Sequence, residues 1–298
     1  MKLSKWKKGI VEWTEGNTAY LSVVFSWDSD DAYQRAVFYK NMGLNVRVGG
    51  PGVFVGKDRF LGVAELGGDI PDAVKRHNPM ATFASRGCPV NCWFCIVPAM
   101  EGREFTFIDD FDPRPILCDN NLSGLPFEYQ KHIVSRYKTE GMDLWDAQSG
   151  FEPATFTDEI YHLWRGINKG PWRFALDEQG EMEDVRRTIA ILKDVPASKK
   201  RVYVLIGNEP FDSCMDRIKS VISWGGEPHV QPLIKLNARE KKPWIKYDWT
   251  EQKLRDVTRW ANRWLWRNIK FEDYIRSTRK PRSKEMVSLQ MFPSLLDG

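Results

Sequence analysis

The stretch WRFALDEQGEMEDVRRTIAILKDVPASKKRVYVLI, residues 172–206, has a β-rich run at each end and a segment with helical spacing between them. Within residues 181–193, Met182, Val185 and Ile189 recur at intervals of three and four, which places them on one face of a helix. A strand, a helix and a second strand in this order predict one βαβ unit with parallel strands.

The same pattern repeats along most of the chain. Six β-rich runs begin 27 to 34 residues apart, which is the length of one βα unit. Six consecutive units predict an all-parallel sheet, either an open doubly wound sheet or a partial barrel. In both architectures the loops that follow the strands carry the chemistry. The runs are ATFAS from Ala81, PILCD from Pro115, MDLWD from Met142, WRFAL from Trp172, RVYVLI from Arg201 and HVQPLIKL from His229.

Two smaller parts flank these units. Residues 1–79 have a strand–helix–strand pattern and predict a small Rossmann-like αβ module, whereas residues 80–237 carry the six units. Residues 238–298 form a basic, Trp-rich helical extension, in which we expect a helix that ends near Trp266 and packs on the sheet. The elements expected in the N-terminal module are a strand at 19–27, a helix at 30–42, a strand at 44–49 and a GGPG turn.

Composition is that of a folded, cytoplasmic protein. The chain has 298 residues, of which 42% are hydrophobic and 28% charged, with a net charge of +4. The start, MKLSKWKKGIVEWTEG, lacks the apolar stretch of a secretory signal, and no apolar run is long enough to cross a membrane. Five cysteines, an odd number, favour free or metal-bound thiols in a reducing cytosol over a disulfide framework.

The most informative segment is RGCPVNCWFCI, in which Cys88, Cys92 and Cys95 follow the first β-rich run with the spacing Cys-x3-Cys-x2-Cys. Three thiolates in one loop can hold three irons of a [4Fe–4S] cluster and leave the fourth iron open to another ligand. Soft thiolates also suit zinc. A closed zinc site needs a fourth ligand, for which Cys118 or His132 could serve.

This loop resembles the cluster-binding motif of the radical S-adenosylmethionine (SAM) superfamily, Cys-x3-Cys-x-aromatic-Cys after the first strand of a partial (β/α)6 barrel. Phe94 stands at the aromatic position. The resemblance implies an α/β fold with a partial, TIM-like barrel, a cluster held by Cys88, Cys92 and Cys95, and SAM bound at the open iron. It also implies SAM cleavage to a 5′-deoxyadenosyl radical that abstracts hydrogen from a substrate, and an external one-electron reductant of the flavodoxin or ferredoxin type.

The resemblance further implies SAM contacts after the later strands. Asp119 and Asn120, after the second run, would accept hydrogen bonds from the methionine ammonium group. Asp177, after the fourth run, would contact the ribose, although it could instead be a helix N-cap or a loop carboxylate. Ile206 and Gly207, at the end of the fifth run, would lie against the adenine, with a strand-ending turn as the alternative for Gly207.

Other polar and thiol groups are weaker candidates. Gln148 and Glu152, after the third run, could contact SAM or substrate, or belong to a surface loop. Cys118 could donate a hydrogen atom to a substrate radical, or simply pack in the core. Cys214 falls in an expected helix, and we interpret it as a core residue.

The N-terminal module resembles a shortened cobalamin-binding domain of the kind that precedes some radical SAM barrels. Domains that ligate cobalamin through its lower axial position typically carry Asp-x-His-x-x-Gly, and this pattern does not occur before Cys88, where His77 is the only histidine. We therefore do not expect cobalamin binding, and interpret the module as a structural cover for one end of the barrel.

The C-terminal extension is strongly basic. Residues 238–298 contain 15 Lys and Arg against 8 Asp and Glu. Positive charge combined with tryptophans is typical of nucleic-acid binding, but also of a solvated helix whose tryptophans dock on the sheet. The basic residues of the extension include Arg276, Arg279, Lys280, Arg282 and Lys284, and its tryptophans include Trp260, Trp264 and Trp266.

Taken together, the cysteine motif and the expected fold predict a radical SAM enzyme acting on a nucleotide, nucleic acid or peptide. The alternative is a non-catalytic, zinc-stabilised nucleic-acid-binding protein.

Overall fold

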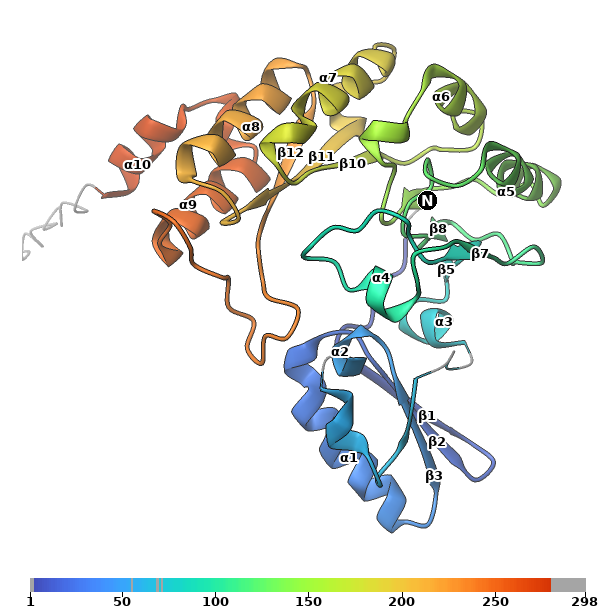
Figure 1. Ribbon diagram of the computed structural model, residues 1–298. Coiled ribbons are helices and arrows are strands. Elements are labelled where there is room, and N and C mark those ends of the chain that lie inside the picture. Colours follow the sequence, from blue (N-terminus) through green and yellow to red (C-terminus); the bar gives the residue numbers. More distant parts are fainter. Residues whose placement is uncertain (1–2, 55, 68–69, 71, 280–298) are drawn as a thin grey trace, which may run out of the picture.

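The computed structural model describes residues 3–54, 56–67, 70 and 72–279, and has a mixed α/β architecture. Ten α-helices and several small sheets lie within these residues, and they form no closed barrel. An N-terminal sheet with its helix lies at one end of the molecule, and the parallel strands with their covering helices lie at the other (Figure 1). No helix in the described ranges is long and apolar enough to cross a membrane.

The N-terminal part is a four-stranded sheet in the order β1-β2-β3-β4. Its β2-α1-β3 unit is parallel, in agreement with the strand–helix–strand pattern, and its buried residues include Leu21, Ala36 and Val48. The pattern missed β1, which forms an antiparallel hairpin with β2, and the short β4. The elements are β1 (Ile10–Glu15), β2 (Thr18–Val23), α1 (Ser29–Asn41), β3 (Asn45–Gly49), α2 (Pro51–Phe54), β4 (Glu65–Leu66) and α3 (Ala73–His77).

Six parallel strands form the larger part, and every β-rich run of the sequence overlaps one of them. They pair in sequence order as two three-stranded sheets, β5-β8-β9 and β10-β11-β12, without the reversal of a doubly wound sheet. A parallel bridge between Leu144 and Asn168 joins the two sheets. The strands are β5 (Ala81–Thr82), β8 (Ile116–Leu117), β9 (Asp146–Ala147), β10 (Trp172–Leu176), β11 (Lys200–Ile206) and β12 (Glu227–Pro232).

Helices cover one side of these strands (Figure 1). Thr157 caps α6 as its position suggests, since its hydroxyl accepts a hydrogen bond from the Ile160 amide at 3.3 Å. Trp164 is fully buried in the core between α5, α6 and the strands. Its indole N–H donates to the Gln130 side chain at 2.9 Å, so this buried donor has a hydrogen-bond partner. The helices are α5 (Phe127–Thr139), α6 (Asp158–Trp164), α7 (Met182–Ile191) and α8 (Phe211–Ser223).

The C-terminal extension packs on the second sheet, as expected. Helix α9 (Glu251–Asn262) buries Leu254, Val257 and Ala261 in the core that also contains β10–β12. It is shorter than expected, because the chain leaves the helical conformation before Trp264, which has φ +54°. Helix α10 (Phe271–Arg279) follows. Lys280, Arg282 and Lys284 lie outside the described residues.

Candidate functional site

The cysteine motif lies in a loop closed at its base by a small hairpin. After β5 the chain forms β6 (Ser85–Arg86), which pairs antiparallel with β7 (Thr106–Phe107), so residues 87–105 leave and return at the same point. Helix α4 (Val97–Met100) lies within this loop, on the inner side of the parallel strands (Figure 1). The loop thus places its cysteines at the carboxyl end of the first parallel strand.

The three loop cysteines are partly exposed free thiols. Burial, together with the negative charge that the neighbouring Cys95, Asp177, Glu152 and Cys88 can carry, raises the pKa of Cys92 to about 12. The three sulfurs are therefore within electrostatic range of one another and of two carboxyl groups. Without a nearby cation these groups stay protonated, whereas iron or another metal would stabilise them as thiolates.

Several N–H groups point at the sulfurs. The Val90 amide bonds to Cys88 and the Val97 amide to Cys95, and these bonds partly offset the effect of burial, which raises both thiol pKa values. The Asn121 side chain donates to the Cys88 sulfur at 4.0 Å. Such N–H···S contacts tune the potential of iron–sulfur clusters. The loop therefore fits a cluster that is held by three thiolates.

Glu101 braces the loop from inside. Its carboxylate pairs with Arg86 at 2.6 Å and accepts hydrogen bonds from the Gly87 amide at 3.0 Å and the Asn120 side chain at 2.7 Å. Gly87 has φ +84°, and a Cβ there would lie 2.1 Å from the carbonyl oxygen of Glu104. Only glycine fits that position, so the entry of the loop is fixed by backbone geometry as well as by Glu101.

A cavity of about 690 Å³ opens beside the loop at the carboxyl ends of the strands. It brings together three of the predicted SAM contacts, Phe94, Gln148 and Asp177. Its volume falls within the range of about 300–1,000 Å³ typical of small-molecule sites. The remaining wall comes mostly from β10, β11 and the chain after β12, through Arg173, Ala175, Tyr203, Leu205, Val230, Leu233, Ile234 and Lys241.

Two carboxyl groups, Asp177 and Glu152, act on the Cys92 thiol, and of the two only Asp177 lines the cavity, together with Arg173 and Lys241. Burial and the neighbouring Glu181 raise the pKa of Asp177, Arg217 opposes them, and the resulting pKa is about 7. Burial also raises the pKa of Glu152. The alternative role of Asp177 as a helix N-cap is wrong, because Glu178 forms the capping box with Glu181. Two partly buried carboxyl groups near the cysteines suit a ligand that carries positive charge.

The residues predicted after β8 lie elsewhere. Asp119 is fully buried, and its oxygens accept hydrogen bonds from the Ala84 amide at 2.8 Å and from the Ser85 hydroxyl. Asn120 donates to Glu101 and to the Gly87 carbonyl oxygen at 3.3 Å. Both side chains therefore hold the cysteine loop in place, and neither lines the cavity. This differs from the predicted contact with the methionine ammonium group of SAM.

Two further predicted contacts also change. Side chains alternate along a strand, so Tyr203 and Leu205 of β11 face the cavity while Ile206 is buried against the helices. Leu205 therefore replaces Ile206 as the apolar side chain at this position. Gly207, with φ +91°, turns the chain where its Cβ would be 3.3 Å from the Trp244 carbonyl oxygen, which agrees with the alternative of a strand-ending turn.

Cys118 and Cys214 are both buried. Cys118 packs with Ala81 and Ile116 under the N-terminal residues Leu3 and Trp6, and burial raises its pKa to about 12. It does not line the cavity, so the packing role fits better than hydrogen-atom donation. Cys214 is a buried residue of α8 and faces the core, as expected.

Sequence reasoning missed the tryptophan of the motif. Trp93 is 55% exposed, donates to Glu178 at 2.8 Å and lies 6.3 Å from the Trp244 ring. It thereby links the cysteine loop to the chain after β10 and to the chain after β12. Sequence reasoning also missed Glu101, within the loop, and Asn121, after β8, since no spacing in the sequence marks a carboxylate or amide that supports a loop.

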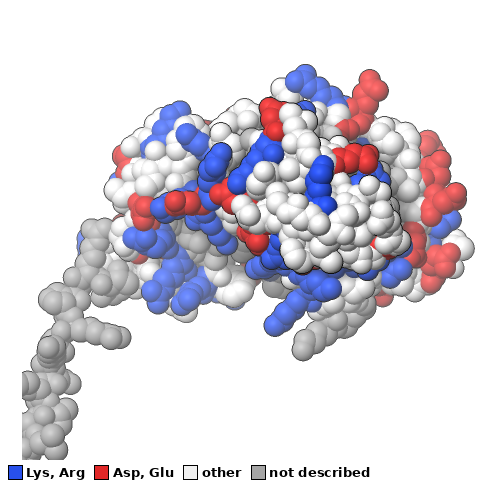
Figure 2. Space-filling view, turned by 90° about the horizontal axis from the view of Figure 1, so that it is seen from below, with Lys and Arg blue, Asp and Glu red and all other residues white. Residues whose placement is uncertain are grey.

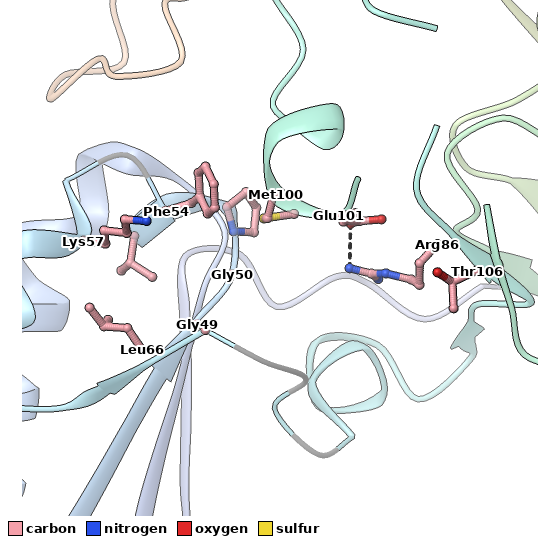
Figure 3. Close-up of a pocket in the computed structure, with 12 residues that line it drawn as sticks. Gly49, Gly50, Phe54, Lys57, Leu66, Arg86, Met100, Glu101 and Thr106 are labelled. Carbon is pink, nitrogen blue, oxygen red and sulfur yellow. Dashed lines mark hydrogen bonds and ion pairs between the residues drawn. The ribbon is translucent and has the colours of Figure 1, made fainter. Parts of the chain in front are cut away.

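A second cavity, of about 540 Å³, separates the cysteine loop from the N-terminal sheet. Figure 3 shows Arg86, Glu101 and Met100 on one side of it and Phe54, Lys57 and Leu66 on the other. His77 takes no part, because it is buried and bonds to the Lys7 carbonyl oxygen and the Ser22 hydroxyl. The N-terminal module therefore lies on one side of the cysteine loop, and the strands that line the 690 Å³ cavity lie on the other.

Within the described residues, no three His, Cys, Asp or Glu side chains are close enough to share one metal ion. Neither fourth ligand of the zinc alternative joins the loop, since Cys118 is buried in its own cluster and the His132 ring lies by the Asp109 carbonyl oxygen at 3.0 Å. No protein-family model matches the chain, and no curated protein shows significant sequence similarity to it.

Proposed function

We propose that this protein is a radical SAM enzyme built on a partial (β/α)6 barrel. The observation that carries the proposal is the placement of Cys88, Cys92 and Cys95 in the loop after the first of six parallel strands, beside a cavity at the carboxyl ends of the others. The unbroken strand order β5 to β12 supports an open barrel, in which such loops form the active site.

The donor set of the loop supports a cluster better than a closed zinc site. Each of three soft thiolates would bind a separate iron, so the sulfurs need not converge on one ion. With the cluster and SAM bound, reductive cleavage of the sulfonium would supply a 5′-deoxyadenosyl radical that abstracts hydrogen from the substrate. Asn121 and the amides of Val90 and Val97 would orient and stabilise the sulfurs.

The cavity has complementary chemistry for SAM. Asp177 would stabilise its positively charged ammonium and sulfonium groups from the cavity wall, and Gln148 would offer hydrogen bonds to the polar portion. Glu152, which acts on the Cys92 thiol but does not line the cavity, would add negative charge near the cysteines. Phe94 and Leu205 would cover the apolar surface of the ligand and exclude water. Exclusion of water matters because a primary radical reacts with whatever lies nearest.

The test is anaerobic reconstitution with iron and sulfide, followed by electron paramagnetic resonance of the reduced protein and an assay for 5′-deoxyadenosine. Wild type and Cys214→Ala, a control that removes a thiol remote from the loop, should show a cluster signal that shifts with SAM and should form the product. Cys92→Ala should keep a folded circular-dichroism spectrum and form none. Unchanged cleavage by Cys92→Ala, or stoichiometric zinc without a cluster in wild type, would refute the proposal.

A further inference from the structure

A groove lined by basic residues runs between α9 and the chain that follows β12. It has a volume of about 750 Å³, and five cations line it against one carboxylate, Glu251. Figure 2 views the molecule from below and shows Lys and Arg gathered on its left. This is the side on which α9 lies in Figure 1. We call it the basic groove; its cations are Lys241, Lys242, Arg255, Arg259 and Arg263.

Helix α9 presents its arginines as a row. Arg255, Arg259 and Arg263 are spaced by four residues, which puts them on one face with a rise of about 6 Å per step. All three are exposed, because the opposite face of α9 is buried against β12. Arg255 pairs with Glu251 at 3.1 Å, while Arg259, Arg263 and Lys241 make no ion pair with any described residue.

The basic groove adjoins the 690 Å³ cavity. Pro232, Ile234 and Lys241 line both of them. A chain-like ligand held along the arginine row can therefore extend one of its units toward Phe94 and the cysteine loop. A groove that leads to the cavity is what a polymeric substrate requires.

Aromatic rings and further cations stand at this junction. Trp244 follows the groove residue Pro243 and packs near Trp93 at 6.3 Å, and Lys235 and Lys246 lie 4.7 Å and 5.4 Å from the Trp244 ring centre. Aromatic rings on which bases stack, next to cations that track phosphates, are typical of single-stranded nucleic-acid sites. An acidic peptide would use the cations but would leave the rings without a planar partner.

We propose that the basic groove binds the phosphate backbone of a single-stranded polynucleotide and delivers one nucleotide to the cavity as the substrate. The delivery step rests on the proposed function, whereas the binding step does not. A single strand is favoured because a base inside a duplex must be unpaired and unstacked before it can enter a cavity, which costs a few kcal/mol.

The test is fluorescence anisotropy with fluorescein-labelled 20-nucleotide RNA and DNA of one mixed sequence, on reconstituted full-length protein over a range of KCl concentrations. Wild type should bind with micromolar affinity at low salt. Arg259→Glu/Arg263→Glu should bind at least tenfold more weakly. The slope of log binding constant against log KCl concentration should become shallower by about 0.7 for each phosphate contact that is lost. Lys131→Glu/Lys138→Glu, which changes the charge equally on α5, should bind like wild type.

The remaining outcomes separate the two proposals. The DNA probe is also annealed to its complement and measured as a duplex. Equal binding by the two double variants, tighter binding of this duplex than of the single strand, or displacement by polyglutamate at equal charge would overturn the groove assignment. A preference between the RNA and DNA probes would identify which polynucleotide is the source. 5′-deoxyadenosine is measured in the same wild-type preparation; its absence refutes the radical chemistry and leaves the binding result intact.

Discussion

Arg217 offers the sharpest test of how the carboxyl ends of β10 and β11 are held. Its guanidinium is fully buried, donates to the Leu176 carbonyl oxygen at 2.7 Å and to Asn208 at 3.3 Å, and pairs with Glu209 at 3.0 Å. Asn208 in turn donates to the Asp177 carbonyl oxygen at 2.6 Å. One side chain from α8 thus ties together the ends of two strands that border the cavity.

Arg217→Met would remove these bonds while retaining apolar bulk. The two closest bonds are charge-assisted, at about 1.5–3 kcal/mol each, and removal of one partner of a buried ion pair costs about 3–5 kcal/mol. We expect a loss of about 3–5 kcal/mol in the free energy of unfolding, or a fall in Tm of about 6–20 °C at about 2–4 °C per kcal/mol.

Urea unfolding followed by tryptophan fluorescence measures this loss. Arg186→Met is the matched control, because Arg186 lies on α7 with a side chain that is 62% exposed, and the change should stay within about 0.5 kcal/mol. SAM affinity should also fall, since Arg217 opposes the rise in the pKa of Asp177 and its removal leaves that carboxyl more protonated at neutral pH. A loss under about 1 kcal/mol, or one equal to that of the control, would refute the role of Arg217.

Two further predictions concern the cysteine loop and its support. Gly87→Ala should lower the iron bound after reconstitution far more than Gly102→Ala. Both glycines have positive φ, but only at Gly87 would a Cβ meet a carbonyl oxygen, at 2.1 Å. Equal iron contents in the two variants would contradict this. Burial raises the pKa of Asp119 from 3.8 to about 6, so its contribution to stability is complete below pH 3.8 and is lost as pH rises through 6. Between pH 5 and pH 8 wild type should lose about 1.4 kcal/mol more unfolding free energy than Asp119→Asn, and parallel urea profiles would contradict this.

The repeat of βα units could be predicted from the sequence because strand and helix periodicities depend on local burial. Each of the six runs overlaps a strand, and Thr157 caps the helix that follows it. The third run was placed four residues early, since β9 begins at Asp146. The hairpin strand β1 was missed because its IVEWTE pattern is half exposed and flanks a Gly rather than a helix.

The cavity could be predicted only in part. Phe94, Gln148 and Asp177 were found because polar or aromatic residues after parallel strands converge on one edge. Ile206 was predicted instead of Leu205 because adjacent residues of a strand face opposite sides of the sheet. The run RVYVLI has apolar residues on both faces, so it does not show which face meets the helices and which meets the cavity. The partners of Arg217 and Glu101 depend on contacts between elements distant in sequence.

Polar residues at the strand ends divide into two groups that the sequence alone does not separate. Asp119, at the end of β8, and Arg217, which reaches the strand ends from α8, are completely buried and bonded to protein groups, and they hold loops and strand ends in place. Asp177 and Gln148 line the cavity, where a ligand can reach them. A carboxylate at a strand end is therefore a candidate ligand only when its oxygens are not already committed to protein donors, and this criterion favours Asp177 over Asp119 as the carboxylate for the proposed SAM site.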